Sequence, residues 1–239
     1  MEMASRLIVH PAASPARNMA IDEALLRLAQ SPVLRIYAWS HPSVSLGYFQ
    51  KASVAPSDRP FVRRYTGGGL VEHGQDLTYT LVLPPLHPLT TAGTLPSYQT
   101  VHRAIAQALH DCGVECHLAT TQPDQDDPAC FLKPVPADIL DPKGRKLAGA
   151  AQRRTKQGCL HQGTILLPQA IPARLHELLP SSLGECLGQP LRPSTLTPPE
   201  IQLANELEQD RYSRREWNFS RYVNSFSFQP PKSLRQRSE

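Results

Sequence analysis

The chain of 239 residues lacks several features that would each indicate a class of protein. It has no run of about 18 apolar residues, so we expect no membrane-spanning segment. Its N-terminus has no apolar stretch typical of a signal peptide. Its 5 cysteines form no C-x-x-C pair and no zinc-finger spacing, which indicates free thiols, a reducing cytoplasm and no metal site. Cys112 and Cys116 are interpreted as packing residues.

The chain also has few aromatic residues and only a small net charge. Aromatics make up 6% of the chain, and the formal net charge is +4. No stripe of arginines interleaved with aromatics is present, so we expect no nucleic acid partner. The mild positive charge suits an acidic protein partner or a phosphate-bearing ligand.

Hydrophobic periodicity predicts an α+β fold. Apolar residues at helical spacing predict helices over 15–30 and 97–112. Irregular alternation of helices with hairpins favours a mixed, mainly antiparallel sheet flanked by helices over a doubly wound parallel sheet. We expect one domain over 1–230 and a frayed tail over 231–239. The other predicted strands cover 7–9, 33–39, 43–49, 77–83, 114–118 and parts of 137–167, and the other predicted helices cover 171–179 and 199–211.

Three consecutive glycines, preceded by two arginines and followed by a histidine, form the first candidate site. Glycine loses more backbone entropy on folding than any other residue, so a triplet is typical of a close backbone approach to a ligand. The stretch is neither a Walker loop nor a dinucleotide fingerprint. We predict a backbone-lined pocket with positive charge at its mouth, and a plain tight turn is the alternative. The candidate ligand-binding residues here are Arg63, Arg64, Gly67, Gly68, Gly69 and His73.

A second candidate is Lys146, which follows the turn signal at 141–144 in a segment rich in Gly and Ala. Small neighbours such as Gly149 leave room for a ligand chain. A lysine among apolar neighbours can act as a fixed cation for a carbonyl or carboxylate oxygen. A hairpin with an exposed lysine is the alternative. His161 and Gly163 follow in the next apolar run.

The third candidate is Cys130, which follows an acidic loop and precedes Lys133. A loop cysteine is exposed more readily than one on a core strand, and nearby lysines lower the pKa of a thiol. Cys130 is therefore a candidate nucleophile, with an incidental free thiol as the alternative.

Taken together, these motifs resemble the lipoate–biotin protein ligase superfamily over roughly 15–168. Segments in the usual order of that superfamily begin at Asn18, Leu34, Ser43, Arg64, Gly144 and His161. The resemblance implies a biotin/lipoate protein ligase-like catalytic domain of the class II synthetase type. It also implies that Lys146 is the active-site lysine, and that Gly67–Gly69 and His161–Gly163 wall an acyl tunnel.

The superfamily contains ATP-dependent ligases and cysteine-dependent octanoyltransferases. The pair Cys130-Phe131 before Lys146 resembles the ligase-like octanoyltransferases. A second octanoyltransferase type uses a Pro-Cys-Gly cysteine, and Cys186 lies in that region but reads Glu-Cys-Leu-Gly. Gly69 is shared with ligases, where transferases often have a larger residue, so the ligase alternative stays open.

The resemblance implies transfer of an octanoyl or lipoyl group from acyl carrier protein, through a Cys130 thioester, to the lysine of a lipoyl domain or glycine cleavage H protein. No cofactor is expected, whereas the ligase alternative needs ATP and magnesium. A non-catalytic subunit that binds lipoyl domains or an acyl cofactor is a further alternative. We expect a monomer. The cations expected to face an acidic partner or the phosphopantetheine arm are Arg63, Arg64, Arg153, Arg154 and Lys156.

Overall fold

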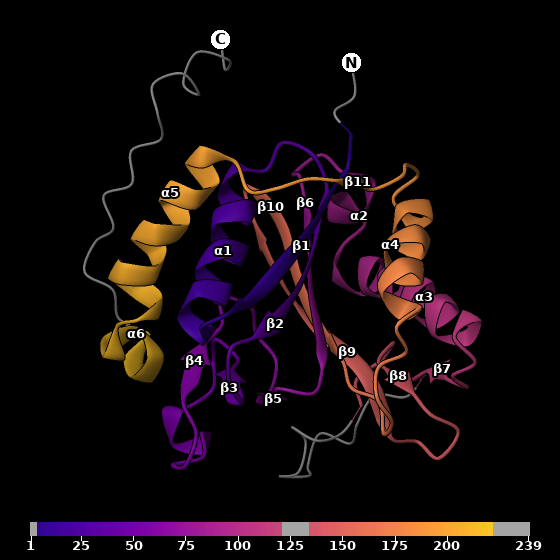
Figure 1. The fold of residues 1–239 in the computed structure, drawn as a ribbon, viewed down its shortest axis with the longest axis horizontal. Helices are drawn as coiled ribbons and strands as arrows, with labels where there is room; N and C mark the ends of the chain where they lie inside the picture. Colours follow the sequence, from indigo (N-terminus) through magenta and orange to yellow (C-terminus); the bar gives the residue numbers. More distant parts are fainter. Residues whose placement is uncertain (1–3, 121–133, 222–239) are drawn as a thin grey trace.

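The computed structural model describes residues 4–120 and 134–221. A large sheet lies between two layers of helices, with a smaller sheet at one end (Figure 1). The strands are β1 (Arg6–Ala13), β2 (Val33–Trp39), β3 (Ser43–Leu46), β4 (Phe61–Arg63), β5 (Val71–His73), β6 (Leu77–Leu83), β7 (His117–Leu118), β8 (Ile139–Leu140), β9 (Lys146–Thr155), β10 (Gly158–Ile165) and β11 (Arg192–Pro193). The helices are α1 (Pro15–Leu28), α2 (Pro88–Thr91), α3 (Thr94–Asp111), α4 (Leu175–Cys186), α5 (Pro198–Leu207) and α6 (Arg215–Ser220), with a 3₁₀ turn at Ala52–Val54 and a π-helical turn at Glu208–Tyr212.

The large sheet has the strand order β11-β1-β2-β6-β10-β9-β8-β7. Strand β1 pairs in parallel with β2 and β11, and the other neighbouring strands of this large sheet pair antiparallel. The small sheet has the order β4-β3-β5. Helices α1 and α5 cover one face of the large sheet, and α3 and α4 cover the other (Figure 1). The predicted α+β architecture with a mainly antiparallel sheet and flanking helices is confirmed.

Local signals explain where the main helices begin. The Ser14 side chain accepts a hydrogen bond from the Arg17 backbone N–H at the start of α1, and proline follows at the first helical position. Thr197 and Glu200 form a capping box at the start of α5. Among the described residues, none of the helices combines the length and apolar character needed to cross a bilayer.

Most predicted elements are present, with different boundaries in places. The predicted strands at 33–39 and 77–83 have the same bounds in the structure, whereas β3 and β7 are shorter than expected. The helix predicted over 171–179 is present with other bounds, because α4 begins at Leu175 and continues through Pro180 to Cys186. Leu179 and Leu183 are fully buried on either side of that proline, so packing against α3 outweighs its local effect. The tail at 231–239 lies outside the described residues.

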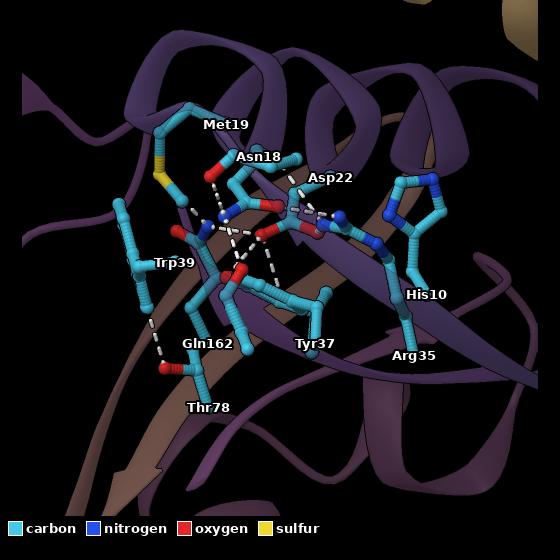
Figure 2. Close-up of polar contacts among 12 residues, drawn as sticks. His10, Asn18, Met19, Asp22, Arg35, Tyr37, Trp39, Thr78 and Gln162 are labelled. Atoms are coloured by element: carbon cyan, nitrogen blue, oxygen red, sulfur yellow. Dashed lines mark hydrogen bonds and ion pairs between the residues drawn. The ribbon is translucent and has the colours of Figure 1, made fainter. Parts of the chain in front are cut away.

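On the α1 face of the sheet, a buried carboxylate joins α1 to three strands (Figure 2). Asp22 accepts hydrogen bonds from Arg35 at 2.7 Å, Tyr37 at 2.9 Å, Thr80 at 2.8 Å and Gln162 at 2.7 Å. Asp22 and Arg35 are both 0% exposed. Each charge is therefore compensated by the other and by neutral donors, which makes a buried ion pair tolerable.

On the α3 face, two buried histidines are joined through a tyrosine. The Tyr79 hydroxyl lies 3.1 Å from His161 Nε2 and 3.4 Å from His102 Nε2. His102 Nδ1 lies 2.7 Å from the Ala137 carbonyl, so this nitrogen carries its proton. Gln152 donates to His161 Nδ1 at 3.0 Å, which places the proton of His161 on Nε2. Both rings are thus held in the neutral form.

Loss of the Asp22 carboxylate should destabilise the fold strongly. Asp22→Ala leaves the Arg35 charge buried without its counter-ion, and we expect a loss of about 3–5 kcal/mol in the free energy of unfolding, measured by urea denaturation. Asp210→Ala is the matched control, since its 3.9 Å pair with Arg214 is solvent-exposed and should be worth less than about 1 kcal/mol. Equal losses in the two variants would contradict this account of the core.

Stability should also fall as the pH drops from about 6.5 towards 4. Burial lowers the pKa of His102 to about 4 and that of His161 well below the ordinary range. In that window the unfolded chain binds protons that the folded chain does not, so the free energy of unfolding decreases, by on the order of 3 kcal/mol for His102. Urea denaturation at neutral and acidic pH measures the slope. His102→Gln should reduce it, whereas the exposed His41→Gln should not.

Candidate active site

Lys146 begins β9, and its ammonium is held by a buried carboxylate. Lys146 Nζ lies 2.7 Å from Asp138 Oδ2; the Asp138 side chain is 0% exposed and the Lys146 side chain 42% exposed. Asp138 also accepts hydrogen bonds from the Tyr98 hydroxyl at 2.7 Å and the Val135 backbone N–H at 2.9 Å. The carboxylate is therefore fixed, and it fixes the ammonium in turn. An ammonium has three N–H donors, so the others remain for a substrate oxygen.

Gly149 provides the space for this ammonium. An ideal Cβ at position 149 would overlap Cε and Nζ of Lys146 and would lie 3.0 Å from Asp138 Oδ1. A side chain at 149 would therefore displace the lysine from its place above the strand. The predicted association of Lys146 with small neighbours is thus explained by the close approach of the Lys146 side chain to the backbone of Gly149.

The glycine loop lies over the same face of β9 and is organised by Arg64. The buried Arg64 guanidinium donates to the carbonyls of Gly67 at 2.9 Å and Gly69 at 2.8 Å, and to the Ser45 hydroxyl at 2.7 Å. Burial lowers its pKa to about 10, so it stays charged at neutral pH. An ideal Cβ on Gly68 would lie 3.3 Å from Cβ of Ala151, which places the loop directly against β9.

A second contact links the glycine loop to the buried carboxylate of Asp22. The Thr66 hydroxyl donates to Gln162 Oε1 at 2.7 Å, and Gln162 Nε2 donates to Asp22 at 2.7 Å. Gln162 therefore connects the loop to the buried carboxylate shown in Figure 2.

His73 takes part in a buried Ser-His-Asp arrangement. Its Nε2 lies 2.7 Å from the Ser45 hydroxyl and its Nδ1 lies 2.8 Å from Asp76 Oδ2. Trp39 stacks on the imidazole with ring centroids 3.9 Å apart. Burial lowers the pKa of His73. Burial would raise the pKa of Asp76, but its hydrogen bonds hold that pKa well below the ordinary range. Ser45 is fully buried and also binds Arg64, so the arrangement supports the glycine loop.

The expectation that five cations face a partner is wrong for three of them. Arg63 is 0% exposed and donates to backbone carbonyls, including those of Gln50 at 2.6 Å and Asn218 at 2.8 Å. Arg64 is buried within the glycine loop, and Arg154 donates to the Gly93 carbonyl at 2.7 Å. Because their N–H groups donate to carbonyls inside the protein, these three side chains stabilise the fold rather than face a partner. The other two cations are Arg153, which is half-buried, and Lys156, which is exposed.

The structure does not bring His161 and the glycine loop together on one face. The side chain of His161 packs on the α3 face with Tyr79, and Gly163 lies against the Tyr79 ring. Because strand residues alternate, Gln162 points to the opposite face, where the glycine loop lies. Alternation from an expected strand could have identified Gln162. Asp138 and Tyr98 have no comparable sequence signal, since only the fold brings Asp138 to Lys146 and Tyr98 to Asp138.

Cys130 lies outside the described residues. The described cysteines are unlike reactive thiols, because burial raises the pKa of each of them. For Cys186 the pKa rises to about 11, and its Sγ lies 3.8 Å from the Thr100 carbonyl at the junction of α4 and α3. Cys186 is thus far better suited to packing than to nucleophilic attack.

Comparison with known proteins identifies relatives of this chain. Octanoyltransferase LipM of Brevibacillus brevis is 31% identical over 274 residues, covering 90% of this chain and 99% of the relative. The LipM protein of Kyrpidia tusciae is 30% identical, covering 90% of this chain and 98% of the relative. The putative lipoate protein ligase Ta0514 of T. acidophilum superposes with a TM-score of 0.77 at 25% identity, covering 91% of this chain and 99% of that structure.

A family model for the lipoyl protein ligase A/B catalytic domain matches residues 14–186, which include α1, the glycine loop, Lys146 and Gln162. Since this match spans most of the chain and the LipM relatives extend over nearly all of it, the chain belongs to the lipoyl protein ligase A/B catalytic domain family.

Proposed function

We propose that this protein transfers an octanoyl or lipoyl group to a lysine amine of a lipoyl domain or glycine cleavage H protein. The donor in this proposal is acyl carrier protein, and the intermediate is a thioester on Cys130. The observation that carries the proposal is the Lys146 ammonium, held by Asp138 beside the glycine loop, in a chain whose relatives are named octanoyltransferases. The relatives named octanoyltransferase LipM support an acyltransferase.

In the first step, the Cys130 thiolate attacks the donor thioester carbon. A new C–S bond forms, the donor C–S bond breaks, and the released pantetheine thiolate takes up a proton. In the second step, the acceptor amine attacks the Cys130 acyl carbon. The C–N bond forms, the Cys130 sulfur leaves, and the proton lost by nitrogen returns to the thiolate.

Lys146 stabilises the oxyanion that develops in both steps. Its ammonium is fixed by Asp138 before the substrate arrives, so little reorganisation is needed when negative charge forms on the carbonyl oxygen. Burial keeps the described cysteines protonated, which supports Cys130 over Cys186 as the nucleophile. The positive net charge of the chain suits an acidic carrier protein.

Cys130→Ser should lose the acyl-enzyme. We expect wild-type protein mixed with octanoyl carrier protein to gain one octanoyl group by intact mass spectrometry, and Cys130→Ser to gain no thioester. Cys186→Ser is the matched control and should label like wild type. Labelling of Cys186 would overturn the assignment. Absence of any label, together with lipoate-dependent pyrophosphate release from ATP, would select the ligase alternative with its need for magnesium.

Gly149→Ala should lower turnover on the order of 100-fold with little change in KM, because the added methyl displaces the Lys146 ammonium. Steady-state kinetics with octanoyl carrier protein measure the effect. In the Lys146→Ala background, the same Gly149→Ala change should cost little further activity. A large additional loss in the double variant would show that position 149 acts by another route.

A further inference from the structure

Arg153 lies on the same face of β9 as the Lys146 ammonium. Residues at i, i+2 and i+4 of a strand share one face. On β9 these are Gly149, against which Lys146 Nζ lies, Ala151, against which Gly68 lies, and Arg153. The glycine loop therefore covers the middle of this face, with one cation on each side of it.

Two tyrosines flank the Arg153 guanidinium. Its Cζ lies 4.5 Å from the ring centroid of Tyr65 and 5.0 Å from that of Tyr48. The two rings are 6.4 Å apart and nearly perpendicular, at 86°. Cation–π contacts of this kind orient a guanidinium without using its N–H donors. All three side chains are half-buried, so the arrangement is partly open to solvent.

The N–H donors of Arg153 have no acceptor within the part of the chain that the structure describes. This distinguishes it from Arg64 and Arg154, whose donors are used by backbone carbonyls. A second guanidinium, that of Arg221, lies 5.9 Å from the Tyr48 ring centroid. Two guanidinium groups thus lie near Tyr48, and that of Arg153 presents a planar set of N–H donors. Arginine binds phosphate with two parallel hydrogen bonds in this geometry.

The separation from Lys146 indicates which phosphate fits. Gly149 and Arg153 are four strand residues apart, so their Cα atoms are separated by about 13 Å at the usual rise per residue of a strand. In an acyl-adenylate the phosphorus is bonded to the acyl carboxyl oxygen, so its phosphate would lie beside Lys146. In a phosphopantetheine thioester, two amide-containing segments separate the acyl group from the phosphate. A carbonyl at Lys146 and a phosphate at Arg153 match the second arrangement.

We propose that Arg153, positioned by Tyr48 and Tyr65, binds the phosphate of the phosphopantetheine arm that delivers the acyl group. This inference rests on the proposed function, because the phosphopantetheine arm is the donor's. Arg153 then acts in donor selection, and Lys146 acts in the chemistry at the other end of the same strand face.

The test compares two donors that differ only in the phosphate: octanoyl-4′-phosphopantetheine and octanoyl-pantetheine. We expect wild-type kcat/KM to favour the phosphorylated donor by about tenfold or more, through KM. Arg153→Gln should bring this ratio close to one. Tyr65→Leu should lower it in part, while Tyr65→Phe, which keeps the ring, should retain it. The matched control is Arg103→Gln, an exposed arginine on α3, which should keep the wild-type ratio.

A wild-type ratio near one, or an equal effect of Arg153→Gln on both donors, overturns the proposal. Equilibrium binding of ATP to wild type and Arg153→Gln tests the other source of phosphate, and loss of ATP affinity without donor discrimination assigns the site to a nucleotide. If neither donor supports transfer, the proposed function fails. Binding of 4′-phosphopantetheine against pantetheine then still tests Arg153, since equal binding of the two by wild type overturns its assignment.

Discussion

The hydrogen bonding of one buried carboxylate organises much of this molecule. Asp22 extends from α1 and accepts from side chains on β2, β6 and β10, so a single group fixes the helix against three strands. One of its donors, Gln162, also accepts from Thr66 at the glycine loop. Because an unpaired charge in this place would cost several kcal/mol, the donors must keep their positions. The loop that borders Lys146 is consequently held by the same contacts that hold the core.

The pleat of the sheet separates two sets of side chains with different requirements. On the α1 face, small residues at 149 and 151 leave room for the Lys146 ammonium and the glycine loop. On the α3 face, neutral histidines and Tyr79 are packed without solvent. The two sets are joined where Tyr98 of α3 donates to Asp138. Each face can therefore satisfy its own packing, while this one hydrogen bond keeps the lysine aligned with the core.

Periodicity in the sequence predicts the α+β architecture, the two long helices and the bounds of β2 and β6, although both strands are buried on their two faces rather than on one. It does not predict the bounds of α4, since the packing of Leu179 and Leu183 outweighs the local effect of Pro180. Lys146 and the glycine triplet are visible as motifs. Asp138 and Gln162 are not, because their importance depends on strand pairing and on which face each side chain occupies. The burial of Arg63 and Arg64 likewise depends on distant carbonyls that no local pattern shows.

The contacts of Arg63 have a consequence for the order in which the chain becomes structured during synthesis. Its guanidinium and backbone bind the 217–218 region, 154 and 155 residues later in the chain. The Trp217 indole donates back to the Arg63 carbonyl at 3.0 Å. A ribosome must therefore release almost all of the described sequence before the strand that leads into the glycine loop can complete its hydrogen bonds. Until then, β4 and the glycine loop that follows it lack the hydrogen bonds that α6 supplies.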